Sequence, residues 1–337
     1  MDDAGHVFVS DFQEPRILVL ALDGQLLATI GRKGRGPGEF TAPTGPVVDA
    51  HGRLFVRNME QVVRFLPDPK SGLPTQFDQA FTGPAMAPWR SKLGSVIDQM
   101  GRFHFPLQVG LRDGLTHYAY RRYDPAGRVL DSLPVPIYPT TRATFAGVRT
   151  GPGGGRMVFG VNVVPFHPMP TWIPTPAGTL LSGAANTYEL METSVRGERL
   201  RTISLAQPPI RIPERERAES AEALKRRIDS LPVPISEVSG ASEEVKAGKL
   251  PSTYPMYVAL AATPAGEIWV QRWPPPELRG RTVLDVFAPT GVYQRTVIIS
   301  KACAVAPALI VRNGILACVV IDQESGAESV LIASVSR

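Results

Sequence analysis

Short runs of apolar residues recur along the whole chain, and tight-turn residues separate them. Six turns end in a glycine that an apolar run follows at once: Gly5, Gly52, Gly101, Gly178, Gly266 and Gly314. A second set of turn glycines falls one hairpin later, at Gly24, Gly72, Gly127, Gly197 and Gly291. Runs bounded by Asp-x-x-Gly or Pro-x-Gly turns predict antiparallel β-hairpins, and their regular return predicts a repeated unit.

Each unit reads as four short strands, here called a, b, c and d in chain order. The second unit shows the pattern most clearly, with strands at 44–49, 53–57, 61–66 and 74–81. Four-stranded antiparallel sheets repeated along a chain are typical of a β-propeller. The sequence therefore predicts an all-β, six-bladed β-propeller. We expect one domain over 1–337, with blades at 1–31, 44–81, 93–135, 169–205, 256–299 and 303–337.

The first and last blades are predicted to be incomplete. The chain begins at an a–b turn, so blade one has no strand a, and blade six reads as a, b and c without a strand d. We expect one preceding segment to supply both strands and any export signal. The alternative is that the short blades stand as they are.

Two insertions interrupt the repeat. Residues 136–168 contain an apolar run and predict an extra strand or arm, and residues 206–255 contain a helix at about 213–230. Acidic residues lead this helix and basic residues trail, which complements the helix dipole. Ala221, Leu224 and Ile228 form a narrow apolar stripe, so we expect a helix that packs on a propeller face.

Composition and charge narrow the function classes. The 337 residues carry a net charge of +5 with scattered arginines, which argues against a nucleic-acid-binding stripe. No apolar stretch approaches the length of a membrane span. We expect a monomer with no nucleic-acid partner.

The two cysteines, Cys303 and Cys318, are predicted to be reduced. A regular hairpin closed at Gly314 would place Cys318 opposite Ala308 and Cys303 near residue 323, beyond disulfide reach. On this interpretation the thiols do not indicate a compartment.

The segment Ile30-Gly-Arg-Lys-Gly-Arg-Gly-Pro-Gly-Glu-Phe40 resembles the linker of an NHL-type repeat. More widely, the chain resembles a bacterial family of six-bladed β-propellers that are exported or lipid-anchored and have no known function. The Val164–Trp172 stretch, the Glu/Arg-rich helix and Gly266-Glu-Ile-Trp-Val270 carry this resemblance. It implies a propeller fold and a periplasmic or cell-surface location, and it brings no established activity.

Physically, the glycines of this linker are expected to allow positive φ where the chain crosses between blades. Pro37 would stiffen the crossing and Phe40 would fill the space between two sheets. The glycines do not predict a phosphate loop, because no strand–loop–helix context follows.

Histidines are the main candidates for chemistry. The five are His6, His51, His104, His117 and His167, and they fall at different levels of the predicted blades. No metal-binding spacing or nucleophile elbow is present. We therefore predict no catalytic residue, no metal and no cofactor. The alternative is a metal-dependent hydrolase or lyase with its site at the central channel, because some six-bladed relatives are lactonases and some NHL-type propellers are lyases.

The face with the b–c loops and d–a crossings, called the loop face below, is the better candidate for binding. Its predicted ligand-binding residues are Asp11, Arg57, Asn58, Arg272 and Trp273 at b-strand ends, and Arg35, Glu39 and Trp172 at crossings. Loops 108–115 and 274–281 would wall it. We expect a non-catalytic module that binds a peptide, protein or glycan here, with Arg57, Arg272 and Trp273 as anchors. The alternatives are that these side chains only seal and bridge the blades, or that the protein is purely architectural.

Overall fold

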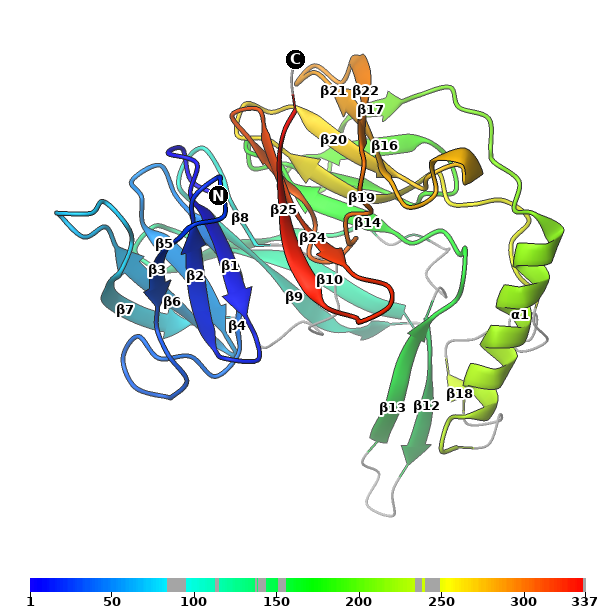
Figure 1. Cartoon of the computed structure of the whole chain (residues 1–337), viewed down its shortest axis with the longest axis horizontal. Coiled ribbons are helices and arrows are strands. Elements are labelled where there is room, and N and C mark those ends of the chain that lie inside the picture. Colours follow the sequence, from blue (N-terminus) through cyan, green and yellow to red (C-terminus); the bar gives the residue numbers. More distant parts are fainter. Residues whose placement is uncertain are drawn as a thin grey trace.

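The computed structural model describes the chain except residues 84–94, 113–114, 137, 139–143, 151–155, 234–237, 240–248 and 336–337. The described residues form six antiparallel β-sheets arranged in a ring, with one long helix outside it (Figure 1). The predicted six-bladed β-propeller is confirmed.

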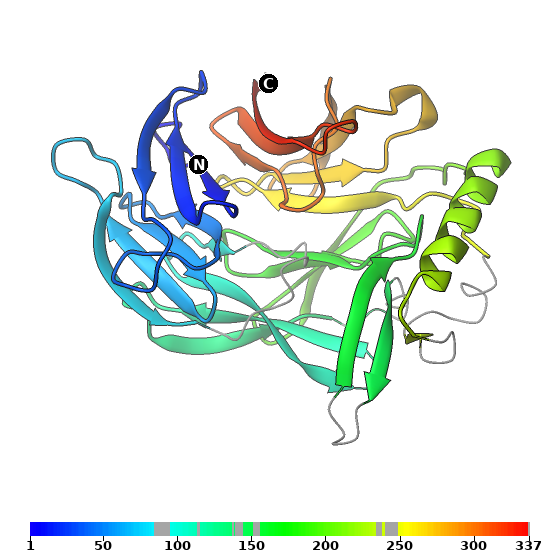
Figure 2. The same cartoon turned by 60° about the horizontal axis from the view of Figure 1, so that its bottom comes forward.

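The blades follow one another along the chain around the ring (Figure 2). Blade one contains β1 (Val7–Asp11), β2 (Arg16–Leu20) and β3 (Leu26–Ile30). Blade two contains β4 (Pro43–Val48), β5 (Leu54–Asn58), β6 (Gln61–Leu66) and β7 (Gln76–Thr82). Blade three contains β8 (Val96–Ile97), β9 (Phe103–Arg112), β10 (Leu115–Tyr123) and β11 (Val129–Pro134).

The second half of the ring repeats this order. Blade four contains β14 (Thr171–Pro174), β15 (Leu180–Gly183), β16 (Glu189–Thr193) and β17 (Arg199–Ser204). Blade five contains β19 (Tyr257–Ala262), β20 (Ile268–Arg272), β21 (Thr282–Phe287) and β22 (Tyr293–Ile299). Blade six contains β23 (Ile310–Arg312), β24 (Ile315–Ile321) and β25 (Glu328–Ser334). As predicted, the first and last sheets have three strands each.

The a–b turns owe their shape to a short polar motif. In blade two, Asp49 Oδ1 accepts hydrogen bonds from the backbone N–H groups of His51 and Arg53, at 2.9 Å each. Asp49 Oδ2 accepts a third, from Arg53 Nε at 2.6 Å. Gly52 adopts a φ of +72°, which a side chain would disfavour. An aspartate and a glycine three residues apart therefore fix the hairpin locally.

The crossing from blade one to blade two departs in part from the expectation. Gly38 has the predicted positive φ of +74°, whereas Gly34 and Gly36 do not. A Cβ at Gly34 would lie 1.9 Å from Glu39 Oε2, so a side chain there would displace the Glu39 carboxylate. Phe40 is fully buried with its ring centroid 5.9 Å from that of Phe65, so it fills the inter-blade space as predicted.

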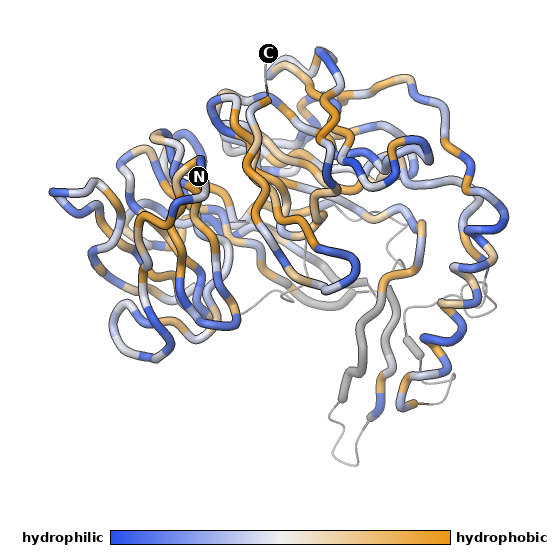
Figure 3. The backbone as a smooth tube through the Cα atoms, in the orientation of Figure 1, coloured by the Kyte–Doolittle hydropathy of each residue, from blue (hydrophilic) through white to orange (hydrophobic). Residues whose placement is uncertain are grey.

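Apolar clusters between adjacent sheets form the core (Figure 3). Ring closure uses the same kind of packing. Val7 and Val9 of blade one pack with Ala317 and Ile332 of blade six. At the edge of this contact, which we call the seam, Arg312 Nε lies 2.7 Å from Asp3 Oδ1. Side-chain packing, rather than a strand shared between the two ends, joins blades one and six within the described residues.

The two insertions form an arm beside the ring (Figure 1). The first contributes β12 (Thr144–Thr150) and β13 (Arg156–Val163), and β12 also pairs with β18 (Val238–Ser239) of the second. The predicted helix is α1 (Glu214–Asp229), with Leu224 and Ile228 buried. It packs on Phe166, Tyr254 and other residues of one apolar cluster. The predicted helical insertion is confirmed, but its apolar stripe packs mainly on other residues of the arm and not on a propeller face as expected.

The prediction of reduced cysteines is wrong. Cys303 and Cys318 form a disulfide with a Cα–Cα distance of 5.6 Å. Cys303 forms a β-bridge with Val320, whereas a regular hairpin would place it near residue 323. Regular pairing of β23 is confined to Ile310–Arg312, and more residues separate Cys303 from Ile310 than separate their partners, Val320 and Ala317, on β24. The excess chain in this segment brings the two thiols together.

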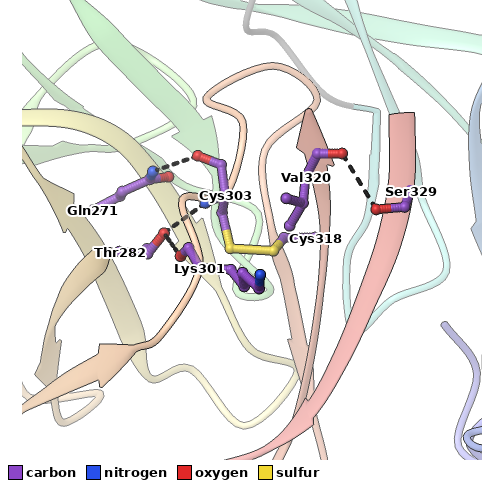
Figure 4. Close-up of a disulfide and its surroundings, with 7 residues drawn as sticks. All are labelled: Gln271, Thr282, Lys301, Cys303, Cys318, Val320 and Ser329. Atoms are coloured by element: carbon purple, nitrogen blue, oxygen red, sulfur yellow. Dashed lines mark hydrogen bonds between the residues drawn. A yellow bond between two sulfur atoms is a disulfide. The ribbon is translucent and has the colours of Figure 1, made fainter. Parts of the chain in front are cut away.

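Hydrogen bonds to blade five hold the cysteine in this place (Figure 4). The Cys303 N–H donates to Thr282 Oγ1 at 2.7 Å, and Gln271 Nε2 donates to the Cys303 carbonyl at 3.2 Å. Because these partners belong to the neighbouring blade, hairpin geometry alone could not reveal them.

Candidate functional site

The loop face differs from the opposite face in the length of its connections. The opposite face carries the short a–b and c–d turns, such as those at Gly52 and Gly266. The loop face carries the d–a crossings, and the two longest of these form the arm. Binding residues often lie on long connections held by a rigid scaffold, so this face remains the candidate site.

At blade two, the predicted residues hold a crossing in place. Asn58 Oδ1 accepts hydrogen bonds from the N–H groups of Thr41 and Ala42, and Asn58 Nδ2 donates to the Glu39 carbonyl. The Glu39 carboxylate accepts hydrogen bonds from the Gly36 N–H and Arg32 Nε, which lower the pKa of this half-buried residue. Asn58 and Glu39 are thus brought together by the crossing, and both have structural partners.

Arg57 lies between blades two and three. Its side chain is buried, its Nε donates to the Met59 carbonyl, and its guanidinium carbon lies 5.9 Å from the centroid of the Phe105 ring. Burial lowers the pKa of Arg57. Arg35 is exposed on the neighbouring crossing. Of these two predicted residues, Arg35 is the more accessible to a ligand.

Asp11 ends β1 and caps the b–c turn of blade one. Its Oδ1 accepts hydrogen bonds from the N–H groups of Gln13 and Glu14, and its Oδ2 lies 3.1 Å from Arg16 Nε. The Trp172 ring packs against the ring of Tyr118 of blade three, with centroids 5.6 Å apart and the planes tilted by 40°. Trp172 Nε1 is buried without a hydrogen-bond partner among the described residues.

Blade five places Arg272 and Trp273 at the foot of the arm. Arg272 Nη2 donates to Gln207 Oε1 at 3.0 Å, and Arg272 Nε lies 3.6 Å from the buried Asp285 carboxylate. Trp273 stacks on Tyr254 at 5.3 Å with an angle of 18° between the rings. These two residues join blade five to the arm, and their side chains are half-buried.

The two loops predicted to wall the loop face differ in structure. Residues 274–281 form a loop with a short 3₁₀ turn, Pro276–Leu278, and Arg279 of this loop pairs with Glu216 of α1. Around the other predicted wall, β9 and β10 extend to Arg112 and Leu115, because their pairing continues beyond the predicted strand ends. Residues 113–114 between them lie outside the described residues.

A hollow of about 440 Å³ lies on the arm, which sequence reasoning missed. It is lined by Pro209, Arg211, Ile212, Glu214, Arg217, Ser252 and Thr253. A β-bridge between Arg211 and Thr253 brings its two sides together. Arg217 is paired with Glu214 at 2.6 Å, whereas Arg211 forms no ion pair within the described part of the chain. The lining of the hollow therefore includes a guanidinium, hydroxyl groups and the apolar side chains of Pro209 and Ile212.

The histidines do not assemble a metal site in the part of the chain that is described. No group of three His, Cys, Asp or Glu side chains there is placed to hold a metal ion. His104 is fully buried, with Nε2 at 2.8 Å from Asp98 Oδ2. Burial raises the pKa of Asp98, but hydrogen bonds from His104 and Arg102 outweigh it and hold that pKa at about 2. This pair lies inside blade three, below the a–b turn, and has a structural role.

A second buried carboxylate lies between blades four and five. Asp285 accepts hydrogen bonds from Tyr188 OH at 2.7 Å and from Thr296 Oγ1 at 2.6 Å. Burial and the neighbouring carboxylate raise the pKa of Tyr188 far above its usual range. The partners of the Asp285 carboxylate all come from blades four and five, so we assign this network to inter-blade packing.

No sequence-family model matches the chain, and no curated protein matches it. Solved structures share its fold. A member of the DUF4221 family from Bacteroides vulgatus is 10% identical, with a TM-score of 0.51 over 98% of this chain and 90% of that one. A candidate exported protein of Bacteroides fragilis is also 10% identical, with a TM-score of 0.46 over 95% and 78% of the two chains.

Virginiamycin B lyase from Staphylococcus aureus has a TM-score of 0.40 at 10% identity, over 94% of this chain and 88% of that one. Of these three, only the DUF4221 structure has a TM-score above 0.5, and at 10% identity that similarity shows the fold alone. None of the helices in the described residues is both long and apolar enough to cross a membrane.

Proposed function

We propose that the protein is a non-catalytic binding module that recognises a peptide or protein segment on the loop face. The observation that carries this proposal is the hollow on the arm, where Arg211 has no ion-pair partner within the described residues. A guanidinium of this kind binds a carboxylate through two parallel hydrogen bonds. We therefore infer an acidic ligand, with Arg272, Trp273 and Arg35 as further contacts on the same face.

The blade-two residues and Asp11 take a supporting part in this proposal. Arg57, Asn58 and Glu39 fix the crossing that presents Arg35, and Asp11 fixes the b–c turn of blade one. Trp172 seals blades three and four. Substituting them would weaken binding by disturbing the face, not by removing a contact to the ligand.

The disulfide supports export as part of the proposal. Disulfides persist mainly in oxidising compartments such as the bacterial periplasm and the cell surface. The Cys303–Cys318 bond therefore favours a periplasmic or cell-surface module over a cytosolic one. We propose that it acts there as a monomer.

The binding proposal is tested with immobilised peptides that differ only in charge. The purified protein is presented with acidic peptides and with the same peptides after Asp and Glu are replaced by Asn and Gln. A glycan panel serves as the competing ligand class. We expect binding to the acidic set by interferometry, and Arg211→Glu should weaken it about tenfold or more, since charge complementarity becomes repulsion.

The matched control is Arg215→Glu, on the same helix. Arg215 is exposed, pairs with Glu219 and does not line the hollow. The Arg215→Glu variant should therefore bind the acidic peptides as the wild-type protein does. Binding that is insensitive to peptide charge, or lost equally in both variants, would contradict the proposed site. A preference for glycans would contradict the ligand class.

A further inference from the structure

Two extended segments and the first turn of α1 meet at the hollow on the arm. The segment before α1 pairs with the segment after it through the β-bridge between Arg211 and Thr253. The Ile212 N–H donates to the Ser252 carbonyl at 2.9 Å, and the Ile212 side chain is buried in the apolar cluster of the arm. The backbone that carries Arg211 is therefore fixed beside the start of the helix.

The two arginines that line the hollow are in different states. Arg217 donates twice to the same carboxylate oxygen, Glu214 Oε2, from Nη2 at 2.6 Å and from Nε at 3.2 Å. Arg211 is exposed and has no ion-pair partner in the part of the chain that the structure describes. A ligand therefore finds the Arg211 guanidinium open, whereas a carboxylate of the protein itself already occupies Arg217.

Glu214 also sets the charge of the hollow, because it belongs to the lining together with Arg211 and Arg217. Two positive side chains and one negative side chain leave a net charge of one positive unit. A single carboxylate of a ligand neutralises this charge. A second carboxylate in the hollow would make it negative overall and would lie near Glu214, and like charges at such contacts are unfavourable.

The pair between Glu214 and Arg217 is one that a ligand can displace. The Glu214 side chain is 78% exposed, and exposed pairs three residues apart on a helix contribute little to stability. Displacement nevertheless leaves the Glu214 carboxylate in the first turn of α1, beside the hollow. A ligand carboxylate at Arg217 therefore replaces one carboxylate with another and is repelled by the one that it displaces.

We propose that Glu214 is a specificity-determining residue of the hollow, an inference that rests on the binding function proposed above. By holding Arg217, Glu214 leaves Arg211 as the guanidinium that the ligand engages. The preferred anchor of the acidic ligand is therefore one carboxylate, and a second carboxylate close to it adds little affinity. Removing the Glu214 charge opens Arg217 and makes the hollow a site for two neighbouring carboxylates.

The test compares two immobilised peptides by interferometry, both acetylated and amidated. The peptide Ser-Thr-Glu-Gly-Glu-Thr-Ser carries two carboxylates, and Ser-Thr-Glu-Gly-Gln-Thr-Ser carries one. The wild-type protein should bind them within about twofold of each other, which is the statistical factor for two equivalent groups. The Glu214→Gln variant should bind the two-carboxylate peptide about fivefold or more tighter than the other, because both guanidiniums then act on one ligand.

The double variant Glu214→Gln with Arg217→Gln should return to a ratio of about twofold, since it lacks the guanidinium that Glu214→Gln opens. The matched control is Glu219→Gln on the same helix. Glu219 is exposed, pairs with Arg215 at 2.8 Å and does not line the hollow, so this variant should keep the wild-type ratio. Circular dichroism checks that each variant folds.

The outcomes separate this inference from the function on which it rests. Binding by the wild-type protein with the same ratio in Glu214→Gln would overturn the role of Glu214 alone. A gain in Glu214→Gln that persists in the double variant would overturn it too, because Arg217 would then not be the group that Glu214 holds. Absence of binding to both peptides in the wild-type protein and in every variant would overturn the proposed function and this inference together.

Discussion

Aspartate carboxylates at the a–b and c–d turns accept the same set of hydrogen bonds from the residues that follow them. Asp49, Asp98 and Asp124 each accept two backbone N–H groups and the Nε of the arginine four residues later. Asp98 also accepts a hydrogen bond from the buried His104. The local part of this arrangement follows from sequence spacing. The contact with His104 does not, because it depends on the pairing of β8 with β9.

Replacing Asp98 with asparagine should destabilise the protein and alter its response to acid. The folded-state pKa of Asp98 is lowered from 3.8 to about 2. Its ionised form therefore stabilises the fold above about pH 4, and this contribution is lost as the pH falls toward 2. We expect Asp98→Asn to lose about 2 kcal/mol at pH 7. Urea titrations at pH 7, 4 and 2.5 measure the free energy of unfolding.

Asp124→Asn provides the comparison, because this turn has the same contacts without a buried histidine. Its effect at pH 7 should be smaller. The loss of wild-type stability between pH 4 and 2.5 should be reduced more in Asp98→Asn than in Asp124→Asn, although the pKa of the Asp124 carboxyl is also lowered by its turn. Equal effects of the two substitutions would argue against a special role for the His104 contact.

Hairpins were predictable at the scale of the element, whereas contacts between elements were not. Turn glycines and apolar runs are adjacent in sequence, so they place the blades, and the charge order of α1 locates the helix. The disulfide depends on hydrogen bonds from Cys303 to blade five, and the hollow depends on the bridge between Arg211 and Thr253. The sequence therefore predicted the insertions that form the arm, but not the hollow that lies on it.

Breaking the disulfide should destabilise the protein. The cysteines are 15 residues apart, and a closed loop of about that length lowers the entropy of the unfolded chain enough to stabilise by roughly 3 kcal/mol. We expect a comparable loss for the double variant Cys303→Ala and Cys318→Ala in urea unfolding. Reductant should lower the wild-type midpoint toward that of the variant and leave the variant unchanged. If reductant leaves the urea unfolding midpoint of the wild-type protein unchanged, the result would contradict the disulfide.

Closure of the whole ring rests on apolar packing at the seam. Val7 and Ala317 are buried there, and the Arg312–Asp3 ion pair lies at its edge. Neither blade lends a strand to the other within the described residues. The expectation that a preceding segment supplies the missing strands stays a prediction. The seam is nonetheless where the two ends of the described chain hold together.

A charge placed in the seam should lower the free energy of unfolding of the whole protein. Ala317→Asp buries a carboxylate between blades one and six, which we expect to cost about 3 kcal/mol or more. Ile321→Asp on the same strand is exposed and should have little effect. Urea unfolding measures both, with limited proteolysis to locate the first cleavage. An equal, small effect of the two substitutions would mean that the seam is not closed in solution.

The unequal connections on the two faces have a consequence for how this protein could change. On one face, each turn sets the register of its blade, so an inserted residue would shift the strands that follow. On the other, crossings of very different length leave the sheets they join intact, and one already carries a helix and a hollow. New specificities can therefore be grafted onto that face by exchanging a crossing, while the ring beneath it is inherited unaltered.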